Sequence, residues 1–483
     1  MSPDELIYLG LLVLSIPLGG LVRQVREPTW RRAVVFAVGA GQVLLTCRWD
    51  TLHSLVTILG TFTILKTAGP RTCHLLTFVW CFGYLAFFRT CHLFHLPSPA
   101  AVANAVQLVL TLKLSSVAFD IRDSHLAEKS RKDGNDNSAD GGAAQEGTRH
   151  KTAEQEFLPV PSLIDLFCYS YCYIGVYTGP FYKYKTYHDF IHQERPSSIP
   201  VIQPLLDRAK WMPLTGGVFL LASRYFPIAY AHTEEFYASS GVPYRLWYML
   251  GMFLVFRMRM YSAWILAECS CITAGLGAYE EWRKPKCGQG PTIKGMPKPE
   301  DKSPQETRYN FDTTKNVDIY WVELGTTIRS GMKYWNMTVQ YWMAEYIYRR
   351  VPHKTFRVAT TMLLSAYWHG FHPGYYLSLM TIPLSLWVET EASTTFRTRL
   401  GIHGQRIWDW LHCVLKMRAY DYMSVGFLLL SFEATTKYWH SICYIYYVFC
   451  AVVLALSYCC KQNGLGHMHN ASRNDTAVKK MSM

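Results

Sequence analysis

Residues 357–390, RVATTMLLSAYWHGFHPGYYLSLMTIPLSLWVET, form an apolar run that decides the fold of this chain. A membrane-spanning helix needs roughly 20 predominantly apolar residues, so this run is long enough for a bent helix or a pair of helices. Two elements interrupt it, Gly370 and Pro373-Gly374, and both residue types end helices. The run therefore predicts membrane helices that meet at a break beside His369.

The rest of the chain repeats this apolar character. Of 483 residues, 50% are hydrophobic and only 17% are charged, whereas soluble domains carry about 25% charged residues. We expect an all-α polytopic membrane protein, a helical bundle of roughly nine to twelve membrane helices around a buried reaction chamber. The apolar segments lie near residues 5–22, 33–47, 54–66, 74–94, 101–119, 160–178, 213–231, 244–278, 357–390, 420–435 and 440–460.

Composition divides the chain into four regions. Residues 1–120 are expected to hold the N-terminal membrane helices, and residues 121–158 form a polar loop with too few apolar side chains to fold, predicted to be disordered. Residues 159–460 form the predicted core, interrupted by a Pro-, Gly- and Lys-rich linker at 281–310. Residues 461–483 form a basic tail.

The distribution of positive charge predicts the topology. The first apolar segment is followed by Arg23, Arg26, Arg31 and Arg32, not preceded by basic residues as in a signal peptide. Since positive charges remain on the cytosolic side, the N-terminus is expected outside the cytosol and the basic C-terminal tail inside it. An odd number of spans follows from this arrangement.

The net charge of +13 is spread over loops and span ends, which disfavours binding to nucleic acid. Membrane lipids with anionic headgroups, or anionic substrates, account for it better. The fourteen cysteines lie mostly in apolar runs and are expected to be free thiols. Cys459 and Cys460, at the end of the last span, are alternatively candidates for palmitoylation.

His369 is the first candidate catalytic residue. Thr361, Ser365 and His369 repeat every four residues, which places them on one helical face, with His372 close to the same line. A neutral imidazole inside a membrane protein can act as a general base. The alternative is a histidine that only bonds to a neighbouring helix. A metal site is not expected, because two histidines without a nearby Cys, Asp or Glu are incomplete.

Asn336 is the second candidate. It lies among aromatic residues in an expected helix, where Gln340 would share its face. A carboxamide can donate to an oxygen that gains negative charge during acyl transfer. The alternative is a hydrogen bond between helices, worth under about 1 kcal/mol on average in membranes.

Arg257 and Arg259 lie in another apolar run. Two arginines can bind the phosphate groups of a lipid or of coenzyme A. Equally, they can end a helix and pair with acids such as Glu268. The residues leave both interpretations open. The chain contains no Walker loop, no GxGxxG after a strand and no HxxxxD acyltransferase signature.

Two stretches resemble the catalytic signatures of the membrane-bound O-acyltransferase family: residues 334–342 (YWNMTVQYW) and 365–376 (SAYWHGFHPGYY). Further strings are similar to the lysophosphatidylinositol acyltransferases within that family. They are residues 169–173 (YSYCY), 178–181 (TGPF), 257–259 (RMR), 274–279 (AGLGAY) and 417–423 (MRAYDYM). The resemblance covers most of the chain, except the 123–156 loop and the tail.

The resemblance implies an enzyme of the endoplasmic reticulum membrane. It implies transfer of a polyunsaturated, arachidonoyl-type acyl group from acyl-CoA to the sn-2 hydroxyl of lysophosphatidylinositol, without a bound cofactor. His369 would be the catalytic histidine and Asn336 its partner. Other candidate substrate-binding residues are Trp335, Gln340, Ser365, Trp368, His372, Arg257 and Arg259.

Three alternatives remain from the sequence. In the first two, the chain is an acyltransferase of the same family, and its acceptor is another lysophospholipid or a protein hydroxyl. In the third, the chain is a transporter and not an enzyme, since helix breaks beside polar groups also occur in transporters.

Overall fold

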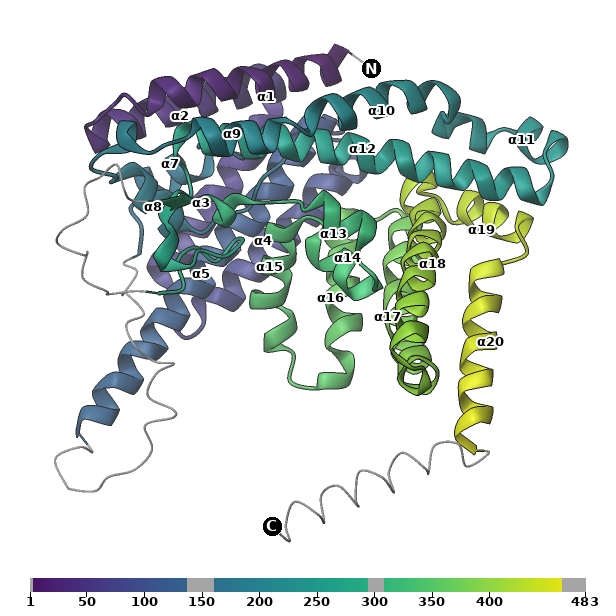
Figure 1. Ribbon diagram of the computed structural model, residues 1–483. Helices are drawn as coiled ribbons and strands as arrows, with labels where there is room; N and C mark the ends of the chain where they lie inside the picture. The colour runs from purple at the N-terminus through teal and green to yellow at the C-terminus, as the bar shows by residue number, and fades with distance from the viewer. Residues whose placement is uncertain (1–2, 137–159, 294–307, 463–483) are drawn as a thin grey trace, which may run out of the picture. The chain divides into compact units, whose positions relative to one another are not determined.

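The computed structural model describes residues 3–136, 160–293 and 308–462 (Figure 1). Within these ranges the secondary structure is helical except for one antiparallel pair of two-residue strands, β1 (Tyr279–Glu280) and β2 (Tyr309–Asn310). The chain divides into two compact units. Unit 1 comprises Met1–Thr215, Met260–Val317 and Asn336–Arg350, and unit 2 comprises Gly216–Arg259, Asp318–Trp335 and Val351–Met483.

The α-helices of unit 1 are α1 (Pro3–Val22), α2 (Pro28–Cys47), α3 (Thr51–Thr67), α4 (Cys73–Thr90), α5 (Ala101–Asp136), α7 (Leu163–Ser170), α8 (Tyr184–Ile191), α9 (Ile202–Ala209) and α15 (Met337–Tyr346). Those of unit 2 are α11 (Glu234–Ser239), α13 (Ile319–Leu324), α14 (Ile328–Tyr334), α16 (Arg357–His369), α17 (Pro373–Thr395), α18 (Ile402–Leu429), α19 (Phe432–Ser441) and α20 (Ile445–Cys460). Two helices, α10 (Met212–Tyr225) and α12 (Val242–Ala274), contain residues of both.

Short 3₁₀ helices join these elements. They are η1 (Arg48–Asp50), η2 (Cys91–Phe94), η4 (Pro196–Ser198), η5 (Ile228–His232), η6 (Glu281–Arg283), η7 (Asp312–Thr314), η8 (Tyr348–Arg350), η9 (Lys354–Phe356) and η10 (Arg397–Arg399).

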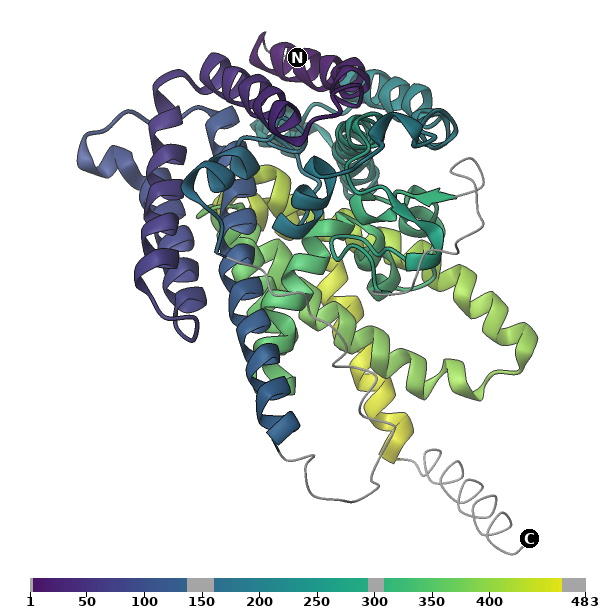
Figure 2. The ribbon, with the colours of Figure 1, turned by 90° about the vertical axis from the view of Figure 1, so that its left-hand side faces the viewer.

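In unit 1, helices α3, α4 and α5 pack side by side (Figure 2). The core around them contains a fully buried cation, Lys113 on α5. Its ammonium donates to the carbonyl of Tyr169 at 3.2 Å and to the hydroxyl of Tyr182 at 2.9 Å. Both rings also lie within cation–π distance of it. The tyrosines thus supply the partners that a buried charge requires.

The arginines that suggested the topology have structural partners. Arg31 is fully buried and donates to the carbonyls of Phe190 and Ile191 at the end of α8, at 3.0 and 2.7 Å. Arg32 pairs with Asp165 at 2.6 Å. Arg23 donates to the carbonyl of Ile199 at 2.5 Å. Because these contacts account for three of the four charges, the inferred orientation of the N-terminus stays a prediction.

In unit 2, α17 packs against α16, α18 and α20 (Figure 1). Glycine allows the closest approach, at the start of α17. A Cβ on Gly374 would lie 2.1 Å from the carbonyl oxygen of Gly426 on α18. The backbone N–H of Gly374 donates to the carbonyl of Leu430 at 2.7 Å. These contacts fix α17 directly after the break that follows His369.

Three helices among the described residues are long and apolar enough to cross a membrane: Cys73–Phe94, Ala101–Arg131 and Val242–Ala274. The pair Phe432–Ser441 and Ile445–Cys460, bent by 66°, would make a fourth. The apolar helix Leu6–Val22 is shorter than the roughly 20 residues of a straight span. Length and composition therefore support fewer spans than the nine to twelve that apolar segments alone suggested.

Two predicted boundaries differ from the structure. Helix α5 continues through residues 121–136, which composition assigned to the disordered loop. The first turn of this extension is packed, with Ile121 and Ser124 buried and Asp123 paired with Arg350 at 2.5 Å, and such tertiary contacts are not visible in composition. Residues 137–158 of that loop lie outside the described ranges. The 281–310 linker contains ordered ends, η6 and β2.

All fourteen cysteines are free, as expected, and Cys459 is exposed. Its palmitoylation, and that of Cys460, stays a prediction. The tail beyond Gln462 lies outside the described residues.

Candidate functional site

The break predicted beside His369 is present. His369 is the last residue of α16, Gly370 caps the helix through its N–H to the carbonyl of Ala366 at 3.0 Å, and α17 begins at Pro373. A Cβ on Gly370 would lie 2.9 Å from the ring of Tyr375, so the residue must be small. The sequence pattern of glycine and proline therefore located this junction correctly.

Aromatic rings surround the half-buried imidazole of His369. The ring of Phe427 meets it edge-on with centroids 4.9 Å apart, and the rings of Trp368 and Tyr375 lie at 4.7 and 5.8 Å. Phe427 comes from α18 and Tyr375 from α17, so three helices define the position of one side chain. Such contacts hold the ring in a fixed orientation.

The other candidates near His369 have different surroundings. Ser365 is half-buried on α16, and Trp368 is buried. His372 is exposed and precedes α17, with its ring 5.8 Å from that of Tyr375. The helical spacing that placed His372 in line with His369 does not apply, because α16 ends at His369.

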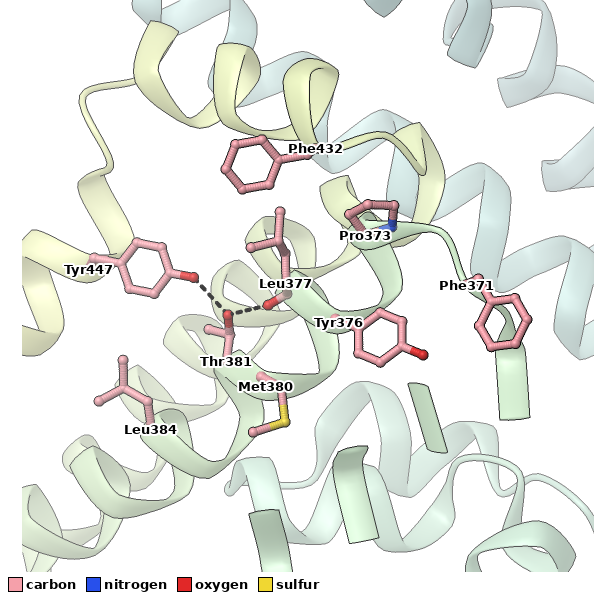
Figure 3. A pocket seen from close by; sticks show the side chains of 9 residues that line it. All are labelled: Phe371, Pro373, Tyr376, Leu377, Met380, Thr381, Leu384, Phe432 and Tyr447. Atoms are coloured by element: carbon pink, nitrogen blue, oxygen red, sulfur yellow. Dashed lines mark hydrogen bonds between the residues drawn. The ribbon is translucent and has the colours of Figure 1, made fainter. Parts of the chain in front are cut away.

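An apolar pocket of about 560 Å³ lies next to the same break (Figure 3). Its polar contact joins the hydroxyls of Thr381 and Tyr447 at 2.8 Å, and Thr381 also donates to the carbonyl of Leu377 at 2.7 Å. A pocket with this lining suits a hydrocarbon chain. It is lined by Phe371, Pro373, Tyr376, Leu377, Met380, Thr381, Leu384, Phe432 and Tyr447.

Asn336 does not lie inside a continuous helix, contrary to the expectation. It separates α14 from α15, with a left-handed backbone at φ 47° and ψ 55°. Asparagine is among the few residue types that tolerate this conformation. Its side chain is half-buried, whereas that of Gln340 is exposed. The aromatic run on both sides concealed the interruption.

Contacts on both sides of Asn336 fix the chain. On the unit 1 side, the N–H of Met337 donates to the carbonyl of Asn316 at 2.7 Å, and the hydroxyl of Thr338 donates to the Oδ1 atom of Asn316 at 2.5 Å. On the unit 2 side, the half-buried Trp335 lies near the ring of Phe256, with centroids 6.2 Å apart.

The segment before Asn336, α13 and α14, is held by buried polar side chains of unit 2. The Lys416 ammonium donates to the carbonyls of Val322, Glu323 and Gly325 at the end of α13, at 2.6, 3.1 and 2.7 Å. The Glu389 carboxylate accepts from the N–H of Ile328 at 2.5 Å, at the start of α14. These two charges complement the helix ends they meet.

Arg257 has carboxylate partners. Its guanidinium lies 2.9 Å from Glu323 and 4.0 Å from the fully buried Asp421, which also pairs with Arg418 at 2.8 Å. Glu268, named as an alternative partner, instead pairs with Arg208 at 3.2 Å. The helix-pairing interpretation thus holds for Arg257, although with different acids.

Arg259 is exposed. Asn336 and Gln340 belong to unit 1, and the other candidate residues belong to unit 2. No group of three or more His, Cys, Asp or Glu side chains that could hold a metal ion occurs in residues 3–136, 160–293 and 308–462.

Sequence reasoning missed Asn316, Thr338, Glu389 and Lys416. The sequence pointed to only two of these four residues. Lys416 and Glu389 are charges in otherwise apolar stretches, which marks them for a structural or chemical role. Asn316 and Thr338 are uncharged, and nothing in the surrounding sequence distinguishes them.

Comparison with known proteins gives a consistent result. The sequence model of MBOAT, the membrane-bound O-acyltransferase family, matches residues 70–415. A Bos taurus protein named membrane-bound acylglycerophosphatidylinositol O-acyltransferase MBOAT7 is 47% identical over 460 residues, which cover 95% of this chain and 93% of that protein. The Drosophila melanogaster protein of the same description, frj, is 33% identical over 95% of this chain and 93% of its own length. The Caenorhabditis elegans protein of the same description, mboa-7, is 28% identical over 92% of this chain and 93% of its own length.

Proposed function

The chain belongs to the membrane-bound O-acyltransferase family, and we propose that it transfers an acyl group from acyl-CoA to the free hydroxyl of lysophosphatidylinositol. Family membership makes the protein an all-α, multi-pass membrane acyltransferase. Support for the acceptor comes from relatives 47% identical over nearly the whole chain, whose names specify acylglycerophosphatidylinositol. The sn-2 position and an arachidonoyl-type acyl group complete the proposal.

In the proposed mechanism, His369 is the general base. Its imidazole takes the proton of the lysolipid hydroxyl as the hydroxyl oxygen attacks the thioester carbonyl. The carbon–sulfur bond then breaks, coenzyme A leaves as the thiolate, and the imidazolium returns a proton to it. Both substrates meet directly, so no acyl-enzyme and no bound cofactor are required. General-base catalysis of this kind contributes roughly 10²–10⁴-fold.

Asn336 is proposed to donate from its carboxamide to the thioester oxygen, which gains negative charge as the bond forms. Loss of one such donor costs roughly 10²–10³-fold in turnover. The observation that carries the mechanism is the placement of His369. The imidazole is half-buried at a helix break and contacts three aromatic rings, and an apolar pocket lies beside the same break.

The proposed substrate-binding residues fall into two groups. Ser365 and Trp368 share α16 with His369, and the pocket beside the break offers apolar surface to an acyl chain. Trp335, Gln340, His372 and Arg259 are proposed to contact substrate outside that pocket. For Arg257, the pairing with Glu323 favours a structural role over phosphate binding.

A substrate panel tests the proposal. Purified protein in detergent micelles is given arachidonoyl-, oleoyl- or palmitoyl-CoA with lysophosphatidylinositol, other lysophospholipids or an acceptor peptide. Coenzyme A thiol release and the acylated product are both measured. We expect the fastest transfer with arachidonoyl-CoA and lysophosphatidylinositol. Transfer confined to another lysophospholipid, or to peptide, would contradict the proposed acceptor.

The proposed location is the endoplasmic reticulum membrane, with a luminal N-terminus and a cytosolic C-terminus. The positive charges that follow the first helix and the basic tail support this orientation. The tail contains glycosylation sequons at Asn470 and Asn474, in a stretch outside the described residues. A cytosolic tail leaves both unmodified, so glycan at either asparagine would contradict the orientation.

A further inference from the structure

The backbone conformation at Asn336 needs support from elsewhere in the chain. Asparagine adopts a left-handed backbone more readily than most residue types, but only as a single residue that the surrounding structure holds in place. The Asn336 side chain makes no capping hydrogen bond to α15. The backbone on its C-terminal side is instead held by contacts of the residues that follow it.

Those residues are held by the side chain and carbonyl of Asn316. Its carbonyl accepts from the N–H of Met337 at 2.7 Å, and its Oδ1 atom accepts from the hydroxyl of Thr338 at 2.5 Å. The same hydroxyl accepts from the N–H of Phe181 at 2.9 Å. Asn316 is 1% exposed and Thr338 is fully buried. The first turn of α15 is thus pinned by one asparagine.

Asn316 is held in turn by Glu268 on α12. One carboxylate oxygen of Glu268 accepts from the N–H groups of Asn316 and Val317, at 2.7 and 3.0 Å. The other oxygen pairs with Arg208 at 3.2 Å. Glu268 is 2% exposed. Hydrogen bonds to an ionised carboxylate are shorter and stronger than those between neutral groups. The bonds to Glu268 are therefore the strongest in this series of contacts.

We propose that Glu268, Asn316 and Thr338 form a positioning network that holds the carboxamide of Asn336 at its working angle. The inference rests on the proposed function, because it assumes that Asn336 acts in acyl transfer. None of the three residues is assigned contact with substrate.

A purely stabilising role explains this network poorly. Replacing a buried ionic or polar group by a well-packed apolar one of similar volume is often neutral or stabilising, so a buried carboxylate is weak evidence for stability. What the hydrogen bonds of this network supply is a defined geometry at the start of α15. This network ends within two residues of Asn336, where it holds the N–H of Met337 and the N–H and hydroxyl of Thr338.

The test compares two substitutions that differ by a hydroxyl. Thr338→Val keeps the shape of the side chain and removes its hydrogen bonds, whereas Thr338→Ser keeps the hydroxyl. We expect Thr338→Val to lower kcat on the order of 10- to 100-fold, as misplacement of a catalytic group does. The KM for acyl-CoA should change little. The thermal midpoint should fall, because the N–H of Phe181 and the Oδ1 atom of Asn316 lose a partner, at a cost of about 1–3 kcal/mol. Thr338→Ser should restore most of the turnover. Glu268→Gln should act in the same direction as Thr338→Val.

The decisive comparison repeats Thr338→Val in an Asn336→Ala background. If the network acts through Asn336, the double variant is no slower than Asn336→Ala alone. An equal additional loss in that background would show a general structural effect and overturn the inference, as would unchanged turnover of Thr338→Val alone. Full turnover by Asn336→Ala would remove the proposed role of Asn336 itself. Failure of the proposed function can be distinguished from failure of the network proposal, because the Asn336→Ala variant is measured with Glu268, Asn316 and Thr338 unchanged.

Discussion

The backbone N–H of Gly374 donates to the carbonyl oxygen of Leu430 at 2.7 Å, and this bond ties the first turn of α17 to the end of α18. His369 lies five residues before Gly374, at the end of α16. Phe427, whose ring meets the imidazole edge-on, lies three residues before Leu430. The same two chain segments therefore fix both the backbone after His369 and the ring that contacts its side chain.

Gly374→Ala tests this contact. The added Cβ would lie 2.1 Å from the carbonyl oxygen of Gly426, so α17 must shift, at a cost of about 1–3 kcal/mol. We expect a lower thermal midpoint and reduced acyl transfer. Gly401→Ala is the matched control, because its Cβ would meet nothing within 4 Å. Equal thermal midpoints and equal transfer rates for the two variants would contradict the close contact between α17 and α18 at Gly374.

Lys416→Met tests the attachment of α13. The substitution keeps the apolar stem and leaves three buried carbonyl groups without their donor, so we expect a loss of about 3 kcal/mol in stability. The measurement is thermal unfolding in detergent. Lys437→Met removes an exposed pairing with Glu234 and should cost under about 1 kcal/mol. A stable Lys416→Met variant would mean that α13 is held by packing alone.

Arg257→Gln separates the two roles considered for this arginine. The substitution removes the 2.9 Å pairing with Glu323 and one of the two arginines near the buried carboxylate of Asp421, so we expect a loss of about 1–3 kcal/mol in stability. We expect a lower thermal midpoint that Asp421→Asn partly restores. An unchanged midpoint with a raised KM for the lysolipid would instead support phosphate binding. The exposed Arg406 on α18 offers the comparison substitution, Arg406→Gln, which should leave stability unchanged.

Met380→Trp tests the apolar pocket beside the helix break. The indole would fill space that we assign to an acyl chain, and Met380 is 38% exposed, which leaves room for the larger group without disturbing the core. The KM for long-chain substrates should rise relative to that for short-chain analogues. Met380→Leu, which preserves volume, should leave the preference unchanged. Identical chain-length profiles for all three proteins would exclude the pocket as an acyl-chain site.

Patterns within a few residues predicted the helix break beside His369. Glycine and proline act on the local backbone, so their positions alone indicated the break after His369. Apolar length likewise indicated membrane helices. His372 was misplaced because helical spacing was extended across that same break.

Features that depend on distant partners could not be predicted. The hydrogen bond between Thr338 and Asn316 joins residues 22 positions apart, and that from Lys416 to Val322 joins residues 94 apart. Nothing in the local sequence of a buried polar residue states which group satisfies it. The left-handed backbone of Asn336 was hidden for the same reason, since the contacts that hold it come from elsewhere in the chain.

The most direct test of the central claim compares wild-type protein with His369→Ala in one assay. Arachidonoyl-CoA and lysophosphatidylinositol are supplied in micelles, and the formation of diacylated phosphatidylinositol is followed by mass spectrometry. His403→Ala, at an exposed position on α18, is the control and should retain wild-type activity. We expect His369→Ala to remain folded, with a wild-type thermal midpoint, and to lose roughly 10²–10⁴-fold in rate. Product formation by His369→Ala at the wild-type rate would contradict the account.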